Sequence, residues 1–82
     1  MVKIYGSILC PDCVLCRNEL DAKGIFYEYL DISEDLRNFK EFLKLRDTQD
    51  AFAEIRCSDR IGIPCIVFEN GTIDFSWEEL IK

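Results

Sequence analysis

Five cysteines are the residues of this chain best suited to covalent chemistry. They are Cys10, Cys13, Cys16, Cys57 and Cys65, and three of them fall within seven positions. The chain has 82 residues and no histidine, which excludes Cys–His nucleophilic pairs, Ser–His–Asp triads and metal sites that contain imidazole. The chemistry of the chain therefore rests on sulfur, as a redox-active thiol or as a metal ligand.

Cys10 and Cys13 have the C-x-x-C spacing of redox-active dithiols. The stretch Cys10-Pro11-Asp12-Cys13 follows an expected strand and opens an expected helix. A cysteine at a helix N-terminus lies beside free backbone N–H groups and the positive end of the helix dipole, which stabilise a thiolate. A second cysteine one turn along lies within reach of it for a disulfide. This placement predicts that Cys10 is the attacking thiolate and Cys13 the resolving thiol.

A metal site is the alternative interpretation of these cysteines. Cys10, Cys13 and Cys16 have the spacing C-x-x-C-x-x-C, which occurs in iron–sulfur proteins, and with Cys65 they would supply four sulfur ligands for zinc or a cluster. One uninterrupted helix, however, points Cys13 and Cys16 inward and leaves little room for a cluster. We therefore favour the redox interpretation, in which no cofactor or metal is expected and the other cysteines are structural or surface thiols.

Composition and charge limit the partners and the cellular compartment that we expect for this protein. The formal net charge is -6, with 16 acidic and 10 basic residues, so neither nucleic acid nor an anionic membrane surface is an expected partner. The sequence shows no secretory signal and no apolar run of bilayer-spanning length. An odd number of clustered cysteines also argues against a secreted disulfide scaffold. We expect a soluble cytoplasmic protein with reduced thiols.

A strand and a helix are expected to position the cysteine pair. Residues 2–5 predict a strand. Pro11 and Gly24 bound a helix over residues 11–23, because proline suits the first helical turn and glycine suits the C-terminal stop. Three residues of this helix recur at i, i+3 and i+7 and form one inward-facing stripe: Cys13, Cys16 and Leu20.

The middle of the chain continues the alternation of strand and helix. Residues 25–32 are rich in aromatic and β-branched residues and predict a strand, after which Ser33 is placed to cap a helix. Residues 48–57 predict a second helical piece, capped by Asp47 or Thr48. The apolar residues at helical spacing in these two helices are Leu36, Phe39, Leu43, Phe52 and Ile55.

A hairpin and a short helix complete the expected fold. Residues 65–69 and 72–75 predict two strands that turn at Asn70-Gly71, and Ser76 is placed to cap the last helix. The order β-α-β-α-(α)-β-β-α contains no linker or repeat and predicts a single α/β domain. Right-handed crossovers then give a four-stranded mixed sheet flanked by helices, which is the arrangement of the thioredoxin fold.

The chain resembles the glutaredoxins of the thioredoxin superfamily over essentially all of residues 1–82. The resemblance rests on C-P-D-C after the first strand, the chain length, and the stretch I-P-C-I-V-F before an Asn-Gly hairpin. It implies a thiol–disulfide oxidoreductase in which Pro64 is a cis proline facing the dithiol and the backbone of Ile63 pairs with the substrate. It also implies that Pro11 and Asp12 lie at the substrate site, with Ile63 and Pro64.

Three places depart from the usual glutaredoxin pattern. Typical members have a lysine three residues before the first cysteine, an aromatic residue between the cysteines, and a Gly-Gly-x-Asp stretch that receives glutathione. Here Ser7, Asp12 and residues 72–75 stand at those places. We therefore expect glutathione to be a poor ligand, with Arg60 as the residue placed to compensate. The expected partners are protein or small-molecule disulfides and a reductase as the electron source, and the sequence leaves open whether glutathione is one of them.

Overall fold

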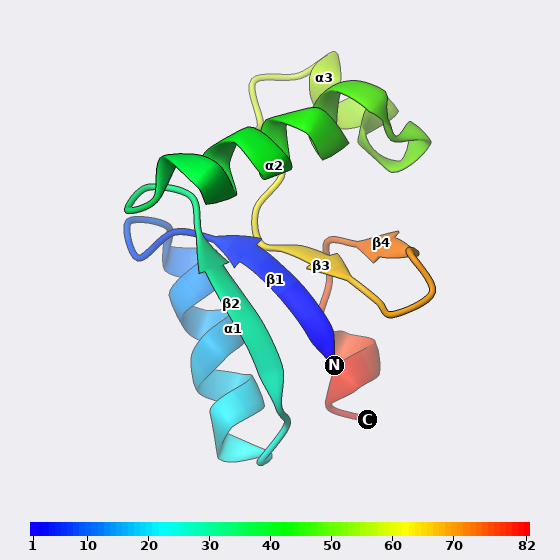
Figure 1. Cartoon of the computed structure of the whole chain (residues 1–82). Coiled ribbons are helices and arrows are strands. Elements are labelled where there is room, and N and C mark those ends of the chain that lie inside the picture. Colours follow the sequence, from blue (N-terminus) through cyan, green and yellow to red (C-terminus); the bar gives the residue numbers. More distant parts are fainter.

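A computed structural model describes residues 1–82, and its centre is a four-stranded mixed sheet with strand order β2-β1-β3-β4 (Figure 1). β1 (Val2–Gly6) runs parallel to β2 (Tyr27–Asp31) and antiparallel to β3 (Cys65–Val67). The short strand β4 (Ile73–Asp74) pairs antiparallel with β3. This topology confirms the predicted α/β class and the thioredoxin-like arrangement of its sheet.

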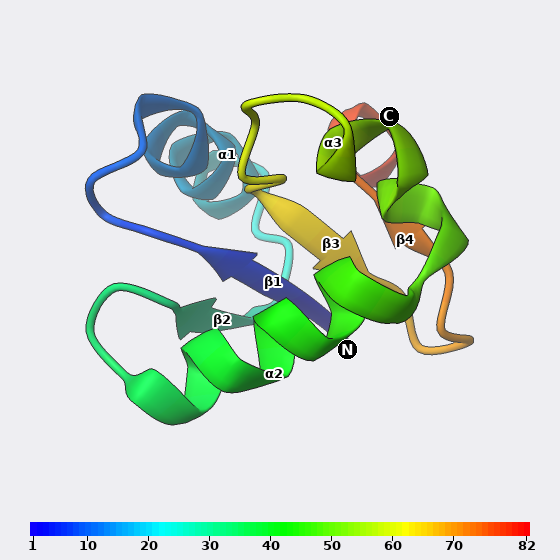
Figure 2. The ribbon, with the colours of Figure 1, turned by 90° about the horizontal axis from the view of Figure 1, so that it is seen from above.

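Helices cover both faces of this sheet. They are α1 (Pro11–Ala22), α2 (Leu36–Thr48) and α3 (Ala53–Arg56). Figure 2 shows α1 and α2 on opposite sides of β1 and β2. Helix α1 ends as predicted, because Gly24 follows it with a φ of 68°, a conformation that glycine adopts at little cost. None of the three helices combines the length and the apolar character needed to cross a membrane.

The two faces of the sheet build two separate hydrophobic clusters. Successive residues of a strand point to opposite faces, so neighbours in β1 and β3 enter different clusters. The cluster beneath α1 contains Ile4, Cys16, Leu20 and Ile66. The cluster beneath α2 and α3 contains Tyr5, Phe42, Phe52, Ile55 and Cys65. The inward stripe predicted for α1 is confirmed, since Cys13, Cys16 and Leu20 are all fully buried.

Helix α2 starts later than the sequence predicts. Asp35, and not Ser33, is the N-cap, and its carboxylate accepts a hydrogen bond from the N–H of Arg37 at 2.8 Å. Ser33 is drawn instead into the turn after β2, where its hydroxyl donates to Asp31 at 2.6 Å. The buried residue of α2 is Phe42. Leu36 and Phe39, which the helical spacing singled out, are 73% and 37% exposed.

The segment after α2 is less helical than predicted. Helix α2 runs through Thr48, so neither Asp47 nor Thr48 caps a second helix. Gln49 adopts an extended backbone, and a 3₁₀ turn over Asp50–Phe52 leads into the four residues of α3. The prediction that Phe52 and Ile55 are buried is nevertheless confirmed.

The C-terminal hairpin is present, but its strands are shorter than predicted. The N–H of Phe68 donates to the carbonyl of Thr72 at 2.8 Å, and Asn70 and Gly71 lie at the turn between them. The expected last helix is a 3₁₀ turn over Glu78–Leu80. Trp77, just before this turn, donates from its indole N–H to Glu19 of α1. This contact ties the C-terminal segment to the helix that begins at the cysteine pair.

Candidate dithiol site

The two cysteines of the C-x-x-C pair occupy different environments at the start of α1. Cys10 is the N-cap with an extended backbone, and its Sγ accepts a hydrogen bond from the N–H of Cys13 at 3.4 Å. Cys10 is partly exposed, whereas Cys13 is fully buried. The strand–helix junction thus holds one partly exposed and one buried sulfur.

Burial governs the acidity of the other thiols near the sheet. Burial, and next the hydrogen bond with Cys10, raises the pKa of Cys13 to about 12, although the N–H of Ser7 opposes this shift. Burial also raises the pKa of Cys65 to about 12, and burial followed by the charge of Glu19 raises the pKa of Cys16 to about 11. These three buried thiols are therefore protonated at neutral pH. Cys10 is the partly exposed sulfur of the C-x-x-C pair.

A hydrogen-bonded turn from β2 holds the loop that carries Cys10. The hydroxyl of Ser7 accepts from the N–H of Leu9 at 3.0 Å and pairs with the hydroxyl of Ser33 at 2.8 Å. Asp31, at the end of β2, accepts from the N–H of Ile8 at 3.1 Å. The sequence analysis did not predict that Asp31 and Ser33 contact the loop that carries Cys10. An aspartate two residues before a serine is a signal for such a turn, but it does not reveal the contact with the cysteine loop.

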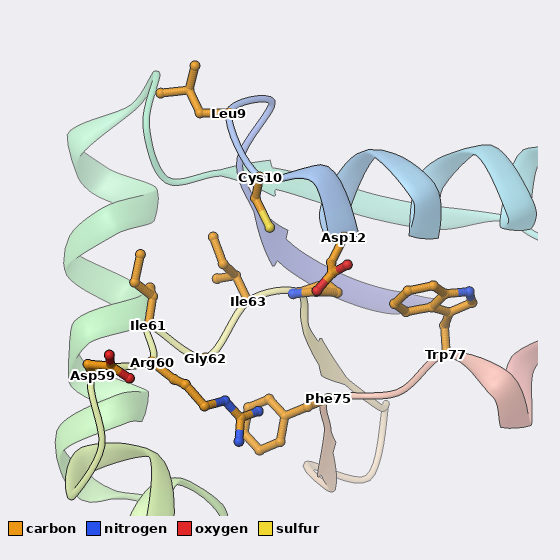
Figure 3. A pocket seen from close by; sticks show the side chains of 11 residues that line it. Leu9, Cys10, Asp12, Asp59, Arg60, Ile61, Gly62, Ile63, Phe75 and Trp77 are labelled. Carbon is orange, nitrogen blue, oxygen red and sulfur yellow. The ribbon is translucent and has the colours of Figure 1, made fainter.

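A cleft of about 580 Å³ opens beside Cys10 and runs between the start of α1 and the segment before β3 (Figure 3). Asp12, Ile63 and Pro64, which the resemblance to glutaredoxins puts at the substrate site, line this cleft. The Ile63–Pro64 peptide bond is cis, as expected. Pro11 is exposed at the first position of α1 and does not line this cleft.

Arg60 also lines this cleft, together with residues that sequence reasoning did not select. These further residues are Leu9, Asp59, Ile61, Gly62, Phe75 and Trp77. The segment is held from α2, because the guanidinium of Arg46 donates to the carbonyls of Arg60 and Ile61, each at 3.0 Å. No local pattern links Arg46 to this loop, so only the folded chain shows that α2 shapes one wall of the cleft.

A second groove, of about 480 Å³ and almost entirely apolar, lies on another side of Cys10. Its rim includes Leu9, Leu36 and Ile61, which are 81%, 73% and 56% exposed. Exposed apolar side chains that gather around a reactive group are typical of a surface that contacts a partner. Leu36 and Phe39 of α2 therefore belong to the surroundings of Cys10.

The four-cysteine metal site is not supported by the structure. No three side chains among the cysteines, aspartates and glutamates come close enough to hold a metal ion. Cys16 lies in the cluster beneath α1, whereas Cys65 lies in the cluster on the other face of the sheet. The alternation of side chains along β3 thus separates Cys65 from Cys16, so the four sulfurs of this alternative do not share one site.

Comparison with known proteins places the chain in a family. No protein-family model matches the chain, and no solved structure matches it. The chain is 34% identical over 70 residues to an uncharacterized protein of Haemophilus influenzae, and the aligned part covers 85% of this chain and 81% of that protein. With this identity over most of both chains, the protein belongs to the same family as the Haemophilus influenzae protein.

Proposed function

We propose that this protein is a glutaredoxin-like thiol–disulfide oxidoreductase that uses Cys10 and Cys13 to exchange electrons with disulfides. The observation that carries the proposal is the position of the Cys10 sulfur. It caps α1 in contact with the N–H of Cys13 and opens into two grooves. A sulfur that accepts a hydrogen bond at a helix N-terminus is suited to react as a thiolate.

The proposed reaction proceeds in two exchange steps. The Cys10 thiolate attacks one sulfur of the substrate disulfide, forms a mixed disulfide, and releases the other substrate sulfur as a thiolate that takes up a proton. Cys13 then loses its proton and attacks the sulfur of Cys10, which forms the Cys10–Cys13 disulfide and releases the second substrate thiolate. Two electrons pass from the dithiol to the substrate. A reductase or another dithiol restores the reduced pair.

The apolar groove favours protein disulfides as substrates. A disulfide in a polypeptide brings flanking side chains that can bury apolar surface against Leu9, Leu36 and Ile61. Ile63 and Pro64, beside the sulfur, are the residues proposed to contact the substrate backbone. We place the reaction in the cytoplasm, where the reducing environment keeps dithiols available.

Substitution of single cysteines tests the proposal. We expect Cys10→Ser to abolish the reduction of a protein disulfide, and Cys13→Ser to complete only the first step and accumulate a mixed disulfide on Cys10. Cys57→Ser is the matched control, because Cys57 is exposed and lies outside both grooves. Peptide mapping after mild oxidation should find Cys10 joined to Cys13. Equal residual turnover of Cys10→Ser and Cys13→Ser, or pairing of Cys10 mainly with Cys57, would reject the proposal.

A further inference from the structure

The hydroxyl of Tyr29 stands out among the buried polar groups of the protein. It is the one buried side-chain oxygen or nitrogen atom without a hydrogen-bond partner. Tyr29 lies in β2, and the guanidinium of Arg17 covers its ring at 4.0 Å from the ring centroid. Buried hydroxyl groups almost always have a partner, because leaving one unpaired costs its lost interaction with water. The hydroxyl therefore calls for an explanation.

Cys13 and Gly6 are the close neighbours of this hydroxyl. A Cβ atom added to Gly6 would lie 2.7 Å from the Tyr29 hydroxyl oxygen and 3.0 Å from the Sγ of Cys13. The oxygen and the sulfur thus approach the same point above the backbone at the end of β1. Any side chain at position 6 would occupy that point, and glycine leaves it open. The unpaired hydroxyl is consequently placed beside the buried sulfur of the dithiol.

We propose, on the basis of the function proposed above, that the Tyr29 hydroxyl is a second hydrogen-bond donor, beside the N–H of Ser7, to the Cys13 sulfur when that sulfur is a thiolate. A thiol is a weak acceptor, so the hydroxyl has no strong partner in the resting dithiol. A buried thiolate is a charged acceptor, and hydrogen bonds to charged groups are roughly twice as strong as those between neutral ones. The donor is therefore used only in the ionised state that reacts.

The role of this donor follows from the second exchange step. Cys13 loses its proton to solvent or to the first departing thiolate, and its sulfur attacks the sulfur of Cys10. The bond between Cys10 and the substrate sulfur breaks, and the substrate leaves with the electron pair. Tyr29 keeps its proton throughout, because burial and the nearby cysteines raise its pKa. In the reverse direction Cys13 departs as a thiolate from the intramolecular disulfide, and the same hydroxyl stabilises it.

Few other ionisable groups face the sulfur and the hydroxyl. They are Cys10, Cys16 and Arg17 from α1 and its cap, and Asp31 from β2. Of these groups only Arg17 carries a positive charge, and it sits on the tyrosine ring, so it also favours a thiolate nearby. Cys10, Cys16 and Asp31 do not favour a second negative charge. The Tyr29 hydroxyl and the N–H of Ser7 are thus the neutral donors placed to counter them.

The test separates the two exchange steps with an aromatic disulfide that releases a coloured thiolate. The full chain carries Cys57→Ser so that its exposed thiol does not react. The first coloured thiolate reports attack by Cys10, and the second reports attack by Cys13, which Cys13→Ser verifies by abolishing it. Tyr29→Phe removes only the hydroxyl. Tyr27→Phe is the matched control, because Tyr27 lies two residues earlier in β2 and its hydroxyl already donates to Asp21 at 2.7 Å.

We expect Tyr29→Phe to slow the second release about tenfold or more, at neutral and at mildly alkaline pH alike, because less of Cys13 is then thiolate. The first release should change by less than about twofold, and Tyr27→Phe should leave both releases unchanged. The thermal stability of Tyr29→Phe should not fall, because the folded protein loses an unpaired hydroxyl.

Two results would overturn the inference while leaving the proposed function intact. One is a second release with the same rate and pH profile in Tyr29→Phe as in the wild-type protein. The other is an equal slowing of both releases, which would show a general structural effect. If the wild-type protein gave no second release that depends on Cys13, both the proposed function and this inference would be rejected.

Discussion

Cys10 and Cys13 lie only three residues apart, yet their sulfur atoms have different environments in the folded protein. The Cys10 sulfur accepts the N–H of Cys13 and faces two grooves, while the Cys13 sulfur is buried and faces Gly6 and Tyr29. In the proposed reaction this accessibility suits Cys10 for the first attack, and the buried Cys13 follows once the mixed disulfide brings a target to it. The division of labour that we propose for the two cysteines rests on their places at one helix N-terminus.

Asp31 is the residue for which the structure predicts a dependence of stability on pH. Burial alone would raise the pKa of this carboxyl, but hydrogen bonds donated by Ser33, Ile8 and Glu34 outweigh burial and lower it. In the unfolded chain an aspartate titrates near pH 4. The stability that Asp31 contributes is therefore fully present above about pH 4 and is lost as the pH falls through its lower folded pKa.

We expect Asp31→Asn to lower the free energy of unfolding by about 1 kcal/mol at pH 7, a value reduced by solvent screening at this partly exposed site. Urea unfolding at pH 7 and pH 3 measures it, and the difference from the wild-type protein should shrink at the lower pH. Asp47→Asn is the control, since Asp47 is exposed and makes no side-chain hydrogen bond that reaches the cysteine loop. A destabilisation that is the same at both pH values would show that the charge is not the cause.

At the scale of elements, helix α2 has two roles. Its buried residue, Phe42, packs against the sheet, while Leu36 and Phe39 border the apolar groove beside Cys10. Near the other end of the helix, Arg46 reaches the carbonyls of Arg60 and Ile61. Helix α2 thereby supports the wall of the cleft opposite the cysteine-bearing helix, although it contributes no reactive group.

Loss of the Arg46 side chain should loosen that wall without unfolding the protein. We expect Arg46→Ala to speed hydrogen exchange of the Gly62 and Ile63 amides relative to amides of β1, and to lower stability by about 1 kcal/mol. Turnover of a protein disulfide should show a severalfold higher KM, while attack by Cys10 on a small disulfide changes less. Arg37→Ala is the control, because Arg37 is 89% exposed and pairs only with nearby Asp35. Unchanged amide exchange in Arg46→Ala would show that the segment over residues 60–63 is stable without the hydrogen bonds from Arg46.

The charge of the whole molecule bears on the choice of substrate. The formal net charge is -6, and the cleft beside Cys10 carries the carboxylates of Asp12 and Asp59 against the guanidinium of Arg60. An anionic disulfide therefore approaches against a repulsive field, which salt screens over about 10 Å at 0.1 M. The apolar groove carries no charged side chain, so it does not repel an anionic substrate.

We expect glutathione to be a poor substrate for this reason. Oxidation of the reduced protein by glutathione disulfide should be slower than oxidation by the cationic disulfide cystamine. Each rate is first divided by the rate at which the same disulfide oxidises dithiothreitol, which corrects for the intrinsic reactivity of the disulfide. The corrected rate with cystamine should exceed that with glutathione disulfide severalfold at low salt, and both added salt and Asp12→Asn should reduce this difference. Fast, saturable turnover of a glutathione mixed disulfide, weakened by Arg60→Ala, would contradict this prediction.

Local features of the chain are predictable from the sequence because they depend on neighbours in the chain. Pro11 and Gly24 bound α1, the spacing of Cys13, Cys16 and Leu20 marks its buried face, and C-x-x-C places two sulfurs within one helical turn. These signals act through helix geometry and backbone conformation, which a few consecutive residues determine. The helix that begins at the cysteine pair follows from them, whereas the α/β class and the mixed sheet follow from the order of strands and helices along the chain.

Contacts between residues far apart in the chain were decided only by tertiary structure. The parallel pairing of β1 with β2 sets Gly6 opposite Asp31, and it is this pairing that brings Asp31 to the cysteine loop and Tyr29 to Cys13. The faces of β3 put Cys65 away from Cys16 and so exclude the four-cysteine metal site. No run of neighbouring residues encodes such contacts, because strand register and the packing of helices on the sheet depend on the whole chain at once.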